Sequence, residues 1–231
     1  MSKFEAFAED LGRNYVIRVG YKDKSWLMKF LGLLMFFNRG FMTHYITTIG
    51  NTVYFPNEDF IKKNELGAIT VLAHEVVHIA QKEKRGFALF AFEYLFPQCL
   101  TIFALLTLLA FVWLPFLWCL LFLLFLAPIP APWRKKFEVE GYTMTLYMSD
   151  LIMRQIGHDD DYILKELSLS AVRIDRLNFR GSGYWYMWPW GVDEEFAKKI
   201  EDIRSGVISD TDEVYGRVRR SYLNAVSAYE L

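Results

Sequence analysis

An almost wholly apolar segment in the middle of the chain, residues 86–133, constrains the fold more than any other feature. Glu93 is the only formal charge among its 48 residues, and its densest part is 99–127. A helix that crosses the hydrocarbon core of a bilayer needs roughly 20 apolar residues. This apolar insert is therefore long enough for two helices and a tight turn, with Leu114-Pro115 or the region of Phe96-Pro97 as the turn or a kink. One long span is the alternative.

Ahead of the apolar insert, the residues His74-Glu75-Val76-Val77-His78 form an H-E-x-x-H motif. Residues four apart share one face of an α-helix, so both imidazoles can bind a single metal ion. Glu75 lies between them and can reach a water molecule on that ion. The arrangement is typical of a zinc peptidase, in which two neutral histidines hold the metal and a carboxylate acts as the base.

The same motif also occurs by chance in helices whose histidines make only ordinary hydrogen bonds. Here the neighbouring residues, 68–73 and Ile79-Ala80, are mostly apolar, which favours the metal site. Burying three ionisable side chains in such a helix is costly unless something compensates them, and a zinc ion does so. Asn64 is a plausible N-cap for this helix, with Glu65 in its first turn.

A zinc ion at this motif needs a third protein ligand. His44 lies in a strand-like stretch and His158 precedes three consecutive aspartates, so neither has a helical setting aimed at a site. Glu138 and Glu140 are better candidates because they lie in a helical segment, 134–148, just after the apolar insert. Residues two apart point to different faces of a helix, so only one of these glutamates is expected to bind.

H-E-x-x-H followed much later by a helical glutamate resembles the gluzincin class of zinc metallopeptidases. In the integral-membrane members, the CAAX-prenyl-protease class and its bacterial relatives, the second motif reads E-x-x-A-D and its first glutamate is the ligand. Glu138-Val139-Glu140-Gly141-Tyr142 is similar, although Tyr142 replaces the aspartate, whose role therefore has no counterpart here. The resemblance implies a ligand set of His74, His78 and Glu138. In a second register, Glu140-Gly141-Tyr142 resembles the motif of soluble aminopeptidase-type gluzincins, in which Glu140 would be the ligand.

Three further strings, 48–56, 130–134 and 184–189, resemble predicted metallopeptidases encoded by tailed bacteriophages. This second resemblance names no substrate, and it leaves a virion-associated location open. Together the resemblances imply a zincin-like fold in one catalytic domain over residues 1–231. We expect a mainly α-helical chain with a small N-terminal β-hairpin or sheet (α+β), and with the apolar helical hairpin inserted between the two metal-binding helices.

The small sheet is expected from two segments, 42–49 and 52–55, which flank Gly50-Asn51 and read as a β-hairpin. A short strand is also expected at 15–19. In zincins a strand just before the metal helix often forms the edge of the cleft, where an extended peptide adds as a further strand. Residues 47–54 would be that element by resemblance; a purely structural hairpin is the alternative.

The expected metal site limits how the apolar insert can cross a membrane. His74, His78 and Glu138 must meet at one ion, so the insert has to cross a bilayer an even number of times or dip in and return. Both flanks are basic, and positively charged flanks stay on the cytoplasmic side; these residues are Lys82, Lys84, Arg85, Arg134, Lys135 and Lys136. A membrane hairpin with both ends inside satisfies both conditions. A hydrophobic hairpin buried in a soluble protein or oligomer is the alternative.

A glycine-hinged and unusually aromatic stretch, 179–191, follows the second metal helix. Aromatic side chains in a loop need burial, a ligand or a membrane surface. If the loop covers the cleft, Tyr184 or Tyr186 can donate a hydrogen bond to the oxyanion that forms at a scissile carbonyl. Packing or interfacial anchoring is the simpler interpretation.

Composition sets the remaining limits. The net charge of −1 gives no sign of nucleic-acid binding. The cysteines, Cys99 and Cys119, both lie in the apolar insert and read as small hydrophobic residues. The first residues are charged and lack the apolar core of a signal peptide, so we expect the catalytic part on the cytoplasmic side.

The sequence thus predicts a membrane-associated zinc-dependent peptidase with Glu75 as general base, protein or peptide as substrate, and membrane lipid as partner. A different class remains open. The chain can instead be a structural or membrane-inserting protein, for instance of a virion, whose metal site clamps two helices or is a relic. A closed site with a fourth protein ligand, such as His44, would support that interpretation.

Overall fold

The computed structural model is mainly helical, with a three-stranded sheet. It describes residues 2–35, 38, 40–127, 129–180, 187–208 and 212–227. The chain forms two compact units, each built from separate stretches of sequence. Unit 1 comprises Met1–Ala80, Met144–Gly157 and Asp202–Leu231, and unit 2 comprises Gln81–Thr143 and His158–Glu201. Two long helices, α4 (Glu65–Arg85) and α6 (Pro132–Ile156), contribute to both units.

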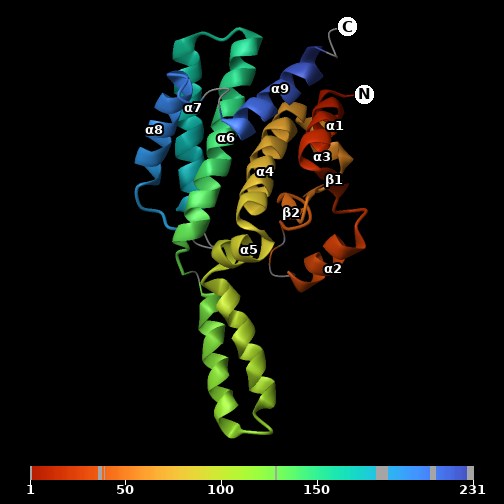
Figure 1. Ribbon diagram of the computed structural model, residues 1–231, viewed down its shortest axis with the longest axis vertical. Coiled ribbons are helices and arrows are strands. Elements are labelled where there is room, and N and C mark those ends of the chain that lie inside the picture. Colours follow the sequence, from red (N-terminus) through yellow and green to blue (C-terminus); the bar gives the residue numbers. More distant parts are fainter. Residues whose placement is uncertain are drawn as a thin grey trace. The chain divides into compact units, whose positions relative to one another are not determined.

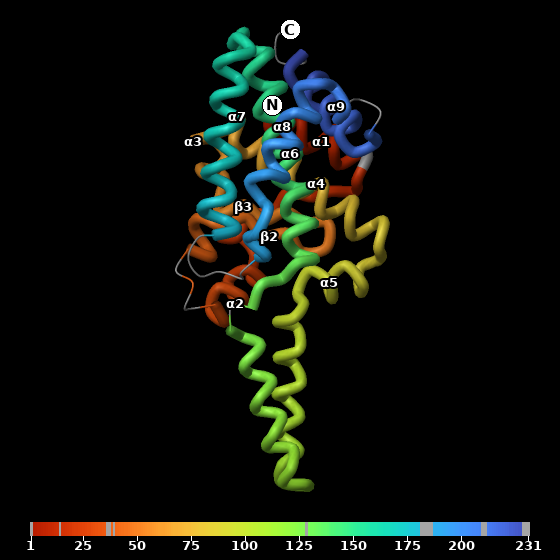
Figure 2. The backbone as a smooth tube through the Cα atoms, turned by 90° about the vertical axis from the view of Figure 1, so that its left-hand side faces the viewer, coloured from red at the N-terminus to blue at the C-terminus, as the bar shows by residue number. Residues whose placement is uncertain are grey.

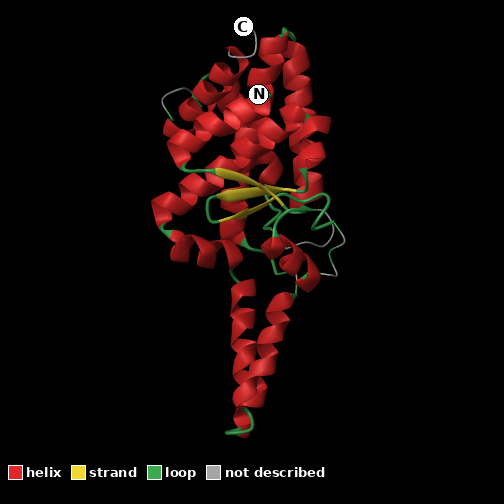
Figure 3. Cartoon of the chain, turned by 90° about the vertical axis from the view of Figure 1, so that its right-hand side faces the viewer, coloured by secondary structure: helices red, strands yellow, loops and turns green. Residues whose placement is uncertain are grey.

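The sheet belongs to unit 1 and is drawn in yellow in Figure 3. Its strands are β1 (Arg18–Tyr21), β2 (Thr47–Ile49) and β3 (Thr52–Phe55), in the order β1-β3-β2. The predicted β-hairpin is confirmed: β2 and β3 pair antiparallel around Gly50, whose φ of 62° suits a glycine in a tight turn. Its first strand is shorter than expected. The strand expected at 15–19 begins only at Arg18 and pairs parallel to β3.

Unit 1 also contains the helices α1 (Lys3–Tyr15), α2 (Trp26–Leu34), α3 (Glu58–Lys63), α9 (Glu213–Ser227) and the parts of α4 and α6 that belong to the unit. Aromatic side chains join α1 to the sheet and to α9. Phe4 of α1 meets Phe55 of β3 edge-on at 5.4 Å between ring centroids, and Phe7 meets Tyr222 of α9 at 6.4 Å. The first residues of the chain therefore belong to the core of this unit.

The sequence around α4 explains why it forms a helix and which face it buries. Asn64 caps it as predicted, because its Oδ1 accepts a hydrogen bond from the Gly67 backbone N–H at 3.0 Å. Ile69, Leu72 and Val76 follow at helical spacing and are fully buried. The motif histidines lie on this helix, within its buried middle part.

Unit 2 contains the apolar insert and the helices around the first half of α6. Its elements are α5 (Phe87–Leu95), η1 (Gln98–Leu109), η2 (Leu114–Leu126), α7 (Asp160–Ile174), the π-helical turn η3 (Asp175–Phe179) and most of α8 (Val192–Arg204). Asp159 caps α7 by accepting a hydrogen bond from the Tyr162 N–H at 2.8 Å.

The apolar insert folds as three helical segments, one more than predicted. α5 ends ahead of Pro97, and η1 then starts at an angle of 93° to it, because proline cannot continue the hydrogen bonding of a helix. η1 and η2 run side by side as a hairpin (Figures 1 and 2), with the turn just before Leu114-Pro115. The Gln98 side chain closes the base of this hairpin by donating to the Ile129 carbonyl at 2.9 Å.

Both arms of the hairpin are 3-10 helices, and their large apolar side chains face outward. On η2, Trp118 is 72% exposed and Leu124 67%, and Phe111 in the turn between the arms is 87% exposed. Within the described residues, no single helix combines the length and the apolar character needed to cross a membrane. The bent pair α5 and η1 passes that test jointly, on length and composition alone.

The basic residues flanking the insert are less available than the sequence suggests. Arg134 and Lys135 are buried, and Lys135 pairs with Glu195 of α8. They therefore stabilise unit 2 rather than present positive charge at its surface. On the other flank, Arg85 is exposed but pairs with Glu93 at 2.8 Å.

Candidate metal centre

His74 and His78 lie one turn apart on α4, as the motif predicts. Both are buried, at 8% and 9% exposure. Their Nε2 atoms face each other at 3.1 Å. Two nitrogens bonded to one tetrahedral zinc ion at 2.0–2.1 Å lie about 3.4 Å apart. The imidazoles therefore already have nearly the separation that a shared ion requires.

The register of α4 against α6 follows from hydrogen bonds within each unit. In unit 1, His74 Nδ1 lies 3.2 Å from Thr145 Oγ1. In unit 2, Gln81 Nε2 donates to the Phe137 carbonyl at 3.3 Å. Because both helices are continuous, these contacts make them antiparallel neighbours. Glu138 is seven residues from Thr145, and so lies two turns away on the same face of α6.

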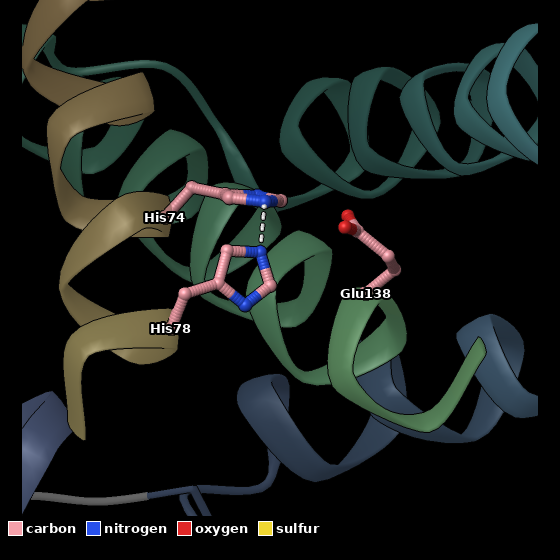
Figure 4. A group of neighbouring side chains, drawn as sticks. All are labelled: His74, His78 and Glu138. Carbon is pink, nitrogen blue, oxygen red and sulfur yellow. Dashed lines mark hydrogen bonds between the residues drawn. The ribbon is translucent and has the colours of Figure 1, made fainter. Parts of the chain in front are cut away.

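The structure brings together the three ligands that the resemblance implies. One ligand atom from each of His74, His78 and Glu138 lies within 4.8 Å of the others, and all three side chains are buried (Figure 4). Two imidazoles and one carboxylate form the donor set of many catalytic zinc sites, which keep a fourth position open. The group has no fourth member among the described residues.

His74 has a second contact that bears on how it can bind an ion. Thr145 Oγ1 lies beside Nδ1, so an N–H at Nδ1 can donate to this hydroxyl. In that tautomer Nε2 carries no proton and can bind an ion through its lone pair. Hydrogen bonds of this kind orient metal-binding histidines and fix their tautomer.

Glu138 is held by a residue that the sequence did not single out. The Tyr94 hydroxyl donates a hydrogen bond to Glu138 Oε1. Arg134, one turn before Glu138 on α6, donates from Nε to the Tyr94 carbonyl at 2.7 Å. Burial lowers the pKa of the Arg134 guanidinium from its ordinary value, while the nearby Glu138 carboxylate acts in the opposite direction. The sequence signal that could have identified Tyr94 is a tyrosine within a mostly apolar segment, because a phenol hydroxyl requires a hydrogen-bond partner when it is buried.

Glu75, the predicted base, is partly buried on α4. The Thr48 hydroxyl of β2 donates to its Oε2 at 2.7 Å. This bond links the motif to the β-hairpin of unit 1. It holds the carboxylate in one orientation.

Other predicted candidates lie elsewhere. Glu140 is exposed and accepts a hydrogen bond from Gln81 Nε2 at 2.6 Å, outside the buried group. His44 is exposed beside Thr43, and His158 is exposed and stacks on Tyr162 at 4.3 Å. Tyr184 and Tyr186 fall outside the described residues.

Comparison with known proteins identifies no relative. The chain matches no family model, no curated protein and no solved structure.

Proposed function

We propose that the protein is a membrane-associated, zinc-dependent peptidase of the gluzincin type with a zincin-like fold. The observation that carries this proposal is the buried group of His74, His78 and Glu138, together with Glu75 next to His74 on α4. Burying three such side chains costs free energy unless a cation compensates them. A bound zinc ion would supply that charge, polarise a carbonyl group and lower the pKa of a bound water molecule.

In this mechanism Glu75 does the proton transfers. Its carboxylate takes a proton from the attacking water molecule, and the oxygen of that water adds to the carbonyl carbon of the peptide. The carbon–nitrogen bond then breaks, and Glu75 delivers the proton to the leaving amine. The hydrogen bond from Thr48 supports this role, because it orients the carboxylate that acts as the base.

A peptide substrate is favoured by the sheet of unit 1. β2 is an edge strand in the order β1-β3-β2, and its Thr48 contacts the Glu75 carboxylate. An extended peptide can add to such an edge through backbone hydrogen bonds. A strand added there would run close to the base that acts on it.

Membrane association is supported by the hairpin of η1 and η2. With the 3-10 rise of about 2.0 Å per residue, the 12 and 13 residues of its arms extend roughly 24–26 Å. The hydrocarbon core of a bilayer is about 30 Å thick. Beyond Gln98 at the base, the arms contain only apolar residues apart from two threonines and two cysteines, which suits lipid.

The test replaces the proposed base without removing a ligand. We expect Glu75→Gln to bind zinc as the wild type does and to hydrolyse an unfolded protein substrate roughly 10²–10⁴-fold more slowly. Zinc content and cleavage are measured on the same detergent-purified samples. His158→Ala, at an exposed histidine, is the matched control and should keep both properties. Full turnover by Glu75→Gln would remove Glu75 from the mechanism.

A further inference from the structure

Tyr94 lies on the inner side of α5, the first helix of the apolar insert. The outer side of α5 carries exposed apolar residues, among them Leu89 and Phe92. On the inner side, Phe90 and Tyr94 pack against Phe137 of α6, with ring centroids at 5.0 Å and 6.4 Å. The ring of Tyr94 is thus fixed beside α6, one residue from Glu138.

Two residues of α6 hold Tyr94 at separate points. Its hydroxyl donates to Glu138 Oε1, and its backbone carbonyl accepts from Arg134 Nε at 2.7 Å. The Arg134 guanidinium also lies over the Tyr94 ring, 4.9 Å from its centroid. Arg134 and Glu138 are four residues apart and therefore share one face of α6. Backbone and side chain of Tyr94 are consequently fixed at the same time.

We infer that Tyr94 is a positioning residue for the proposed metal centre, and that the apolar insert sets metal affinity through it. The inference rests on the function proposed above. The hydrogen bond from the phenol to Oε1 orients the Glu138 carboxylate. Hydrogen bonds to a ligand from outside the coordination sphere orient it, and losing one typically weakens metal binding 10–100-fold.

The hydrogen bond from Tyr94 to Glu138 gives a reason why the insert lies between the two helices that carry the proposed ligands. The insert separates the two helices that carry the ligands, and α5 returns a side chain to one of those ligands. The hairpin begins just beyond α5, where Gln98 ties its base to the Ile129 carbonyl. The lipid-facing part proposed above and the metal ligand are thereby joined by a short series of contacts within unit 2.

The experiment is a zinc titration of the full-length, detergent-purified protein against a competing chelator. We expect Tyr94→Phe to bind zinc 10–100-fold more weakly than the wild type. Tyr162→Phe removes a hydroxyl from an exposed tyrosine of the same unit and should leave the affinity unchanged. The visible absorption spectrum of the cobalt-loaded protein gives a second measure, since a freed carboxylate that binds through both oxygens changes the coordination number.

Packing and positioning are separated by Phe90→Leu, which weakens the contact with Phe137 but keeps the Tyr94 hydroxyl. A purely structural role predicts that Phe90→Leu and Tyr94→Phe weaken zinc binding alike. The positioning role predicts a loss, and a changed cobalt spectrum, only in Tyr94→Phe. Wild-type affinity in Tyr94→Phe would overturn the inference while leaving the metal site intact. No zinc binding by the wild type would instead overturn the proposed function, and this inference with it.

Discussion

The faces of α4 and α6 that carry the proposed metal ligands and the hairpin of η1 and η2 depart from the usual distribution of residues in opposite ways. The first region buries ionisable side chains, with His74, His78 and Glu138 at 8%, 9% and 8% exposure. The second exposes aromatic and aliphatic side chains, such as Phe111 at 87%. Each departure costs free energy in water, by loss of hydration in one case and by exposure of apolar surface in the other.

This difference indicates what each region requires. Buried ionisable groups are stabilised by an opposite charge, and a metal ion is the partner that fits two imidazoles and a carboxylate. Exposed apolar groups are stabilised by an apolar environment, and lipid is the partner that fits an apolar hairpin. The proposed peptidase combines both requirements in one chain. Two predictions test whether the two regions respond separately, and a third concerns a buried cation outside both.

The largest expected effect is on stability when zinc is removed. A ligand that binds only the folded state, at a free concentration 1,000 times its dissociation constant, adds about 4 kcal/mol to the free energy of unfolding. We expect chelation to lower the melting temperature of the wild type, and zinc to restore it. Glu138→Ala should show no response to either treatment. An equal response in Glu138→Ala would show that zinc acts elsewhere on the protein.

A charge on the hairpin should weaken lipid binding without affecting the metal centre. Arginine at the centre of a membrane helix costs about 2.5–3.5 kcal/mol, which corresponds to a partition coefficient roughly 100-fold lower. We expect that order of loss for Leu124→Arg, measured by flotation with phospholipid vesicles. Val172→Arg, on an exposed position of α7, is the control. Unchanged flotation of Leu124→Arg would argue that protein, and not lipid, covers the hairpin.

A buried cation outside both regions extends the comparison. Lys22 is 0% exposed; its Nζ donates to the Phe41 carbonyl at 2.6 Å and lies 4.0 Å from the centroid of that ring. Burial lowers its pKa from 10.5 to about 8. The unfolded chain therefore binds more protons than the folded chain between pH 8 and 10.5, and this lysine makes stability rise with pH across that window.

Lys22→Met keeps the length of the side chain and removes the charge. We expect the free energy of unfolding of the mutant to lose this rise with pH. The rise is a contribution of roughly 2–3 kcal/mol, and partial solvation of Lys22 reduces it. Denaturant unfolding at pH 7.5 and pH 10 measures it. Identical pH dependence in the two proteins would show that Lys22 is hydrated in solution.

Local sequence signals predicted the elements on which the account depends. The metal helix could be placed because its cap, Asn64, and its apolar spacing lie within a few residues of one another. The turn of the β-hairpin was set by Gly50-Asn51, and the hairpin of the apolar insert by length and composition. Each of these signals depends on neighbours in the sequence, which is why they could be read without a structure.

One local signal was overlooked: α1 was not predicted, although Ser2 and Glu5 form a capping box at its start. Other features were missed because they depend on distant residues. The role of Tyr94 depends on a carboxylate 44 residues away. Arg134 and Lys135 were read as membrane flanks, yet contacts with Tyr94 and α8 bury them. A basic side chain next to an apolar segment has the same appearance in sequence whether it faces solvent or a buried acceptor.

The most direct test of the central claim is the zinc content of the purified protein, measured by mass spectrometry. The account predicts about one zinc ion per chain in the wild type and in the control variants His158→Ala and Glu140→Ala. It predicts loss of that ion in His74→Ala and in Glu138→Ala. A folded wild type without zinc, or zinc that survives both substitutions, would contradict the proposed centre and leave the apolar hairpin as the feature that a different function must explain.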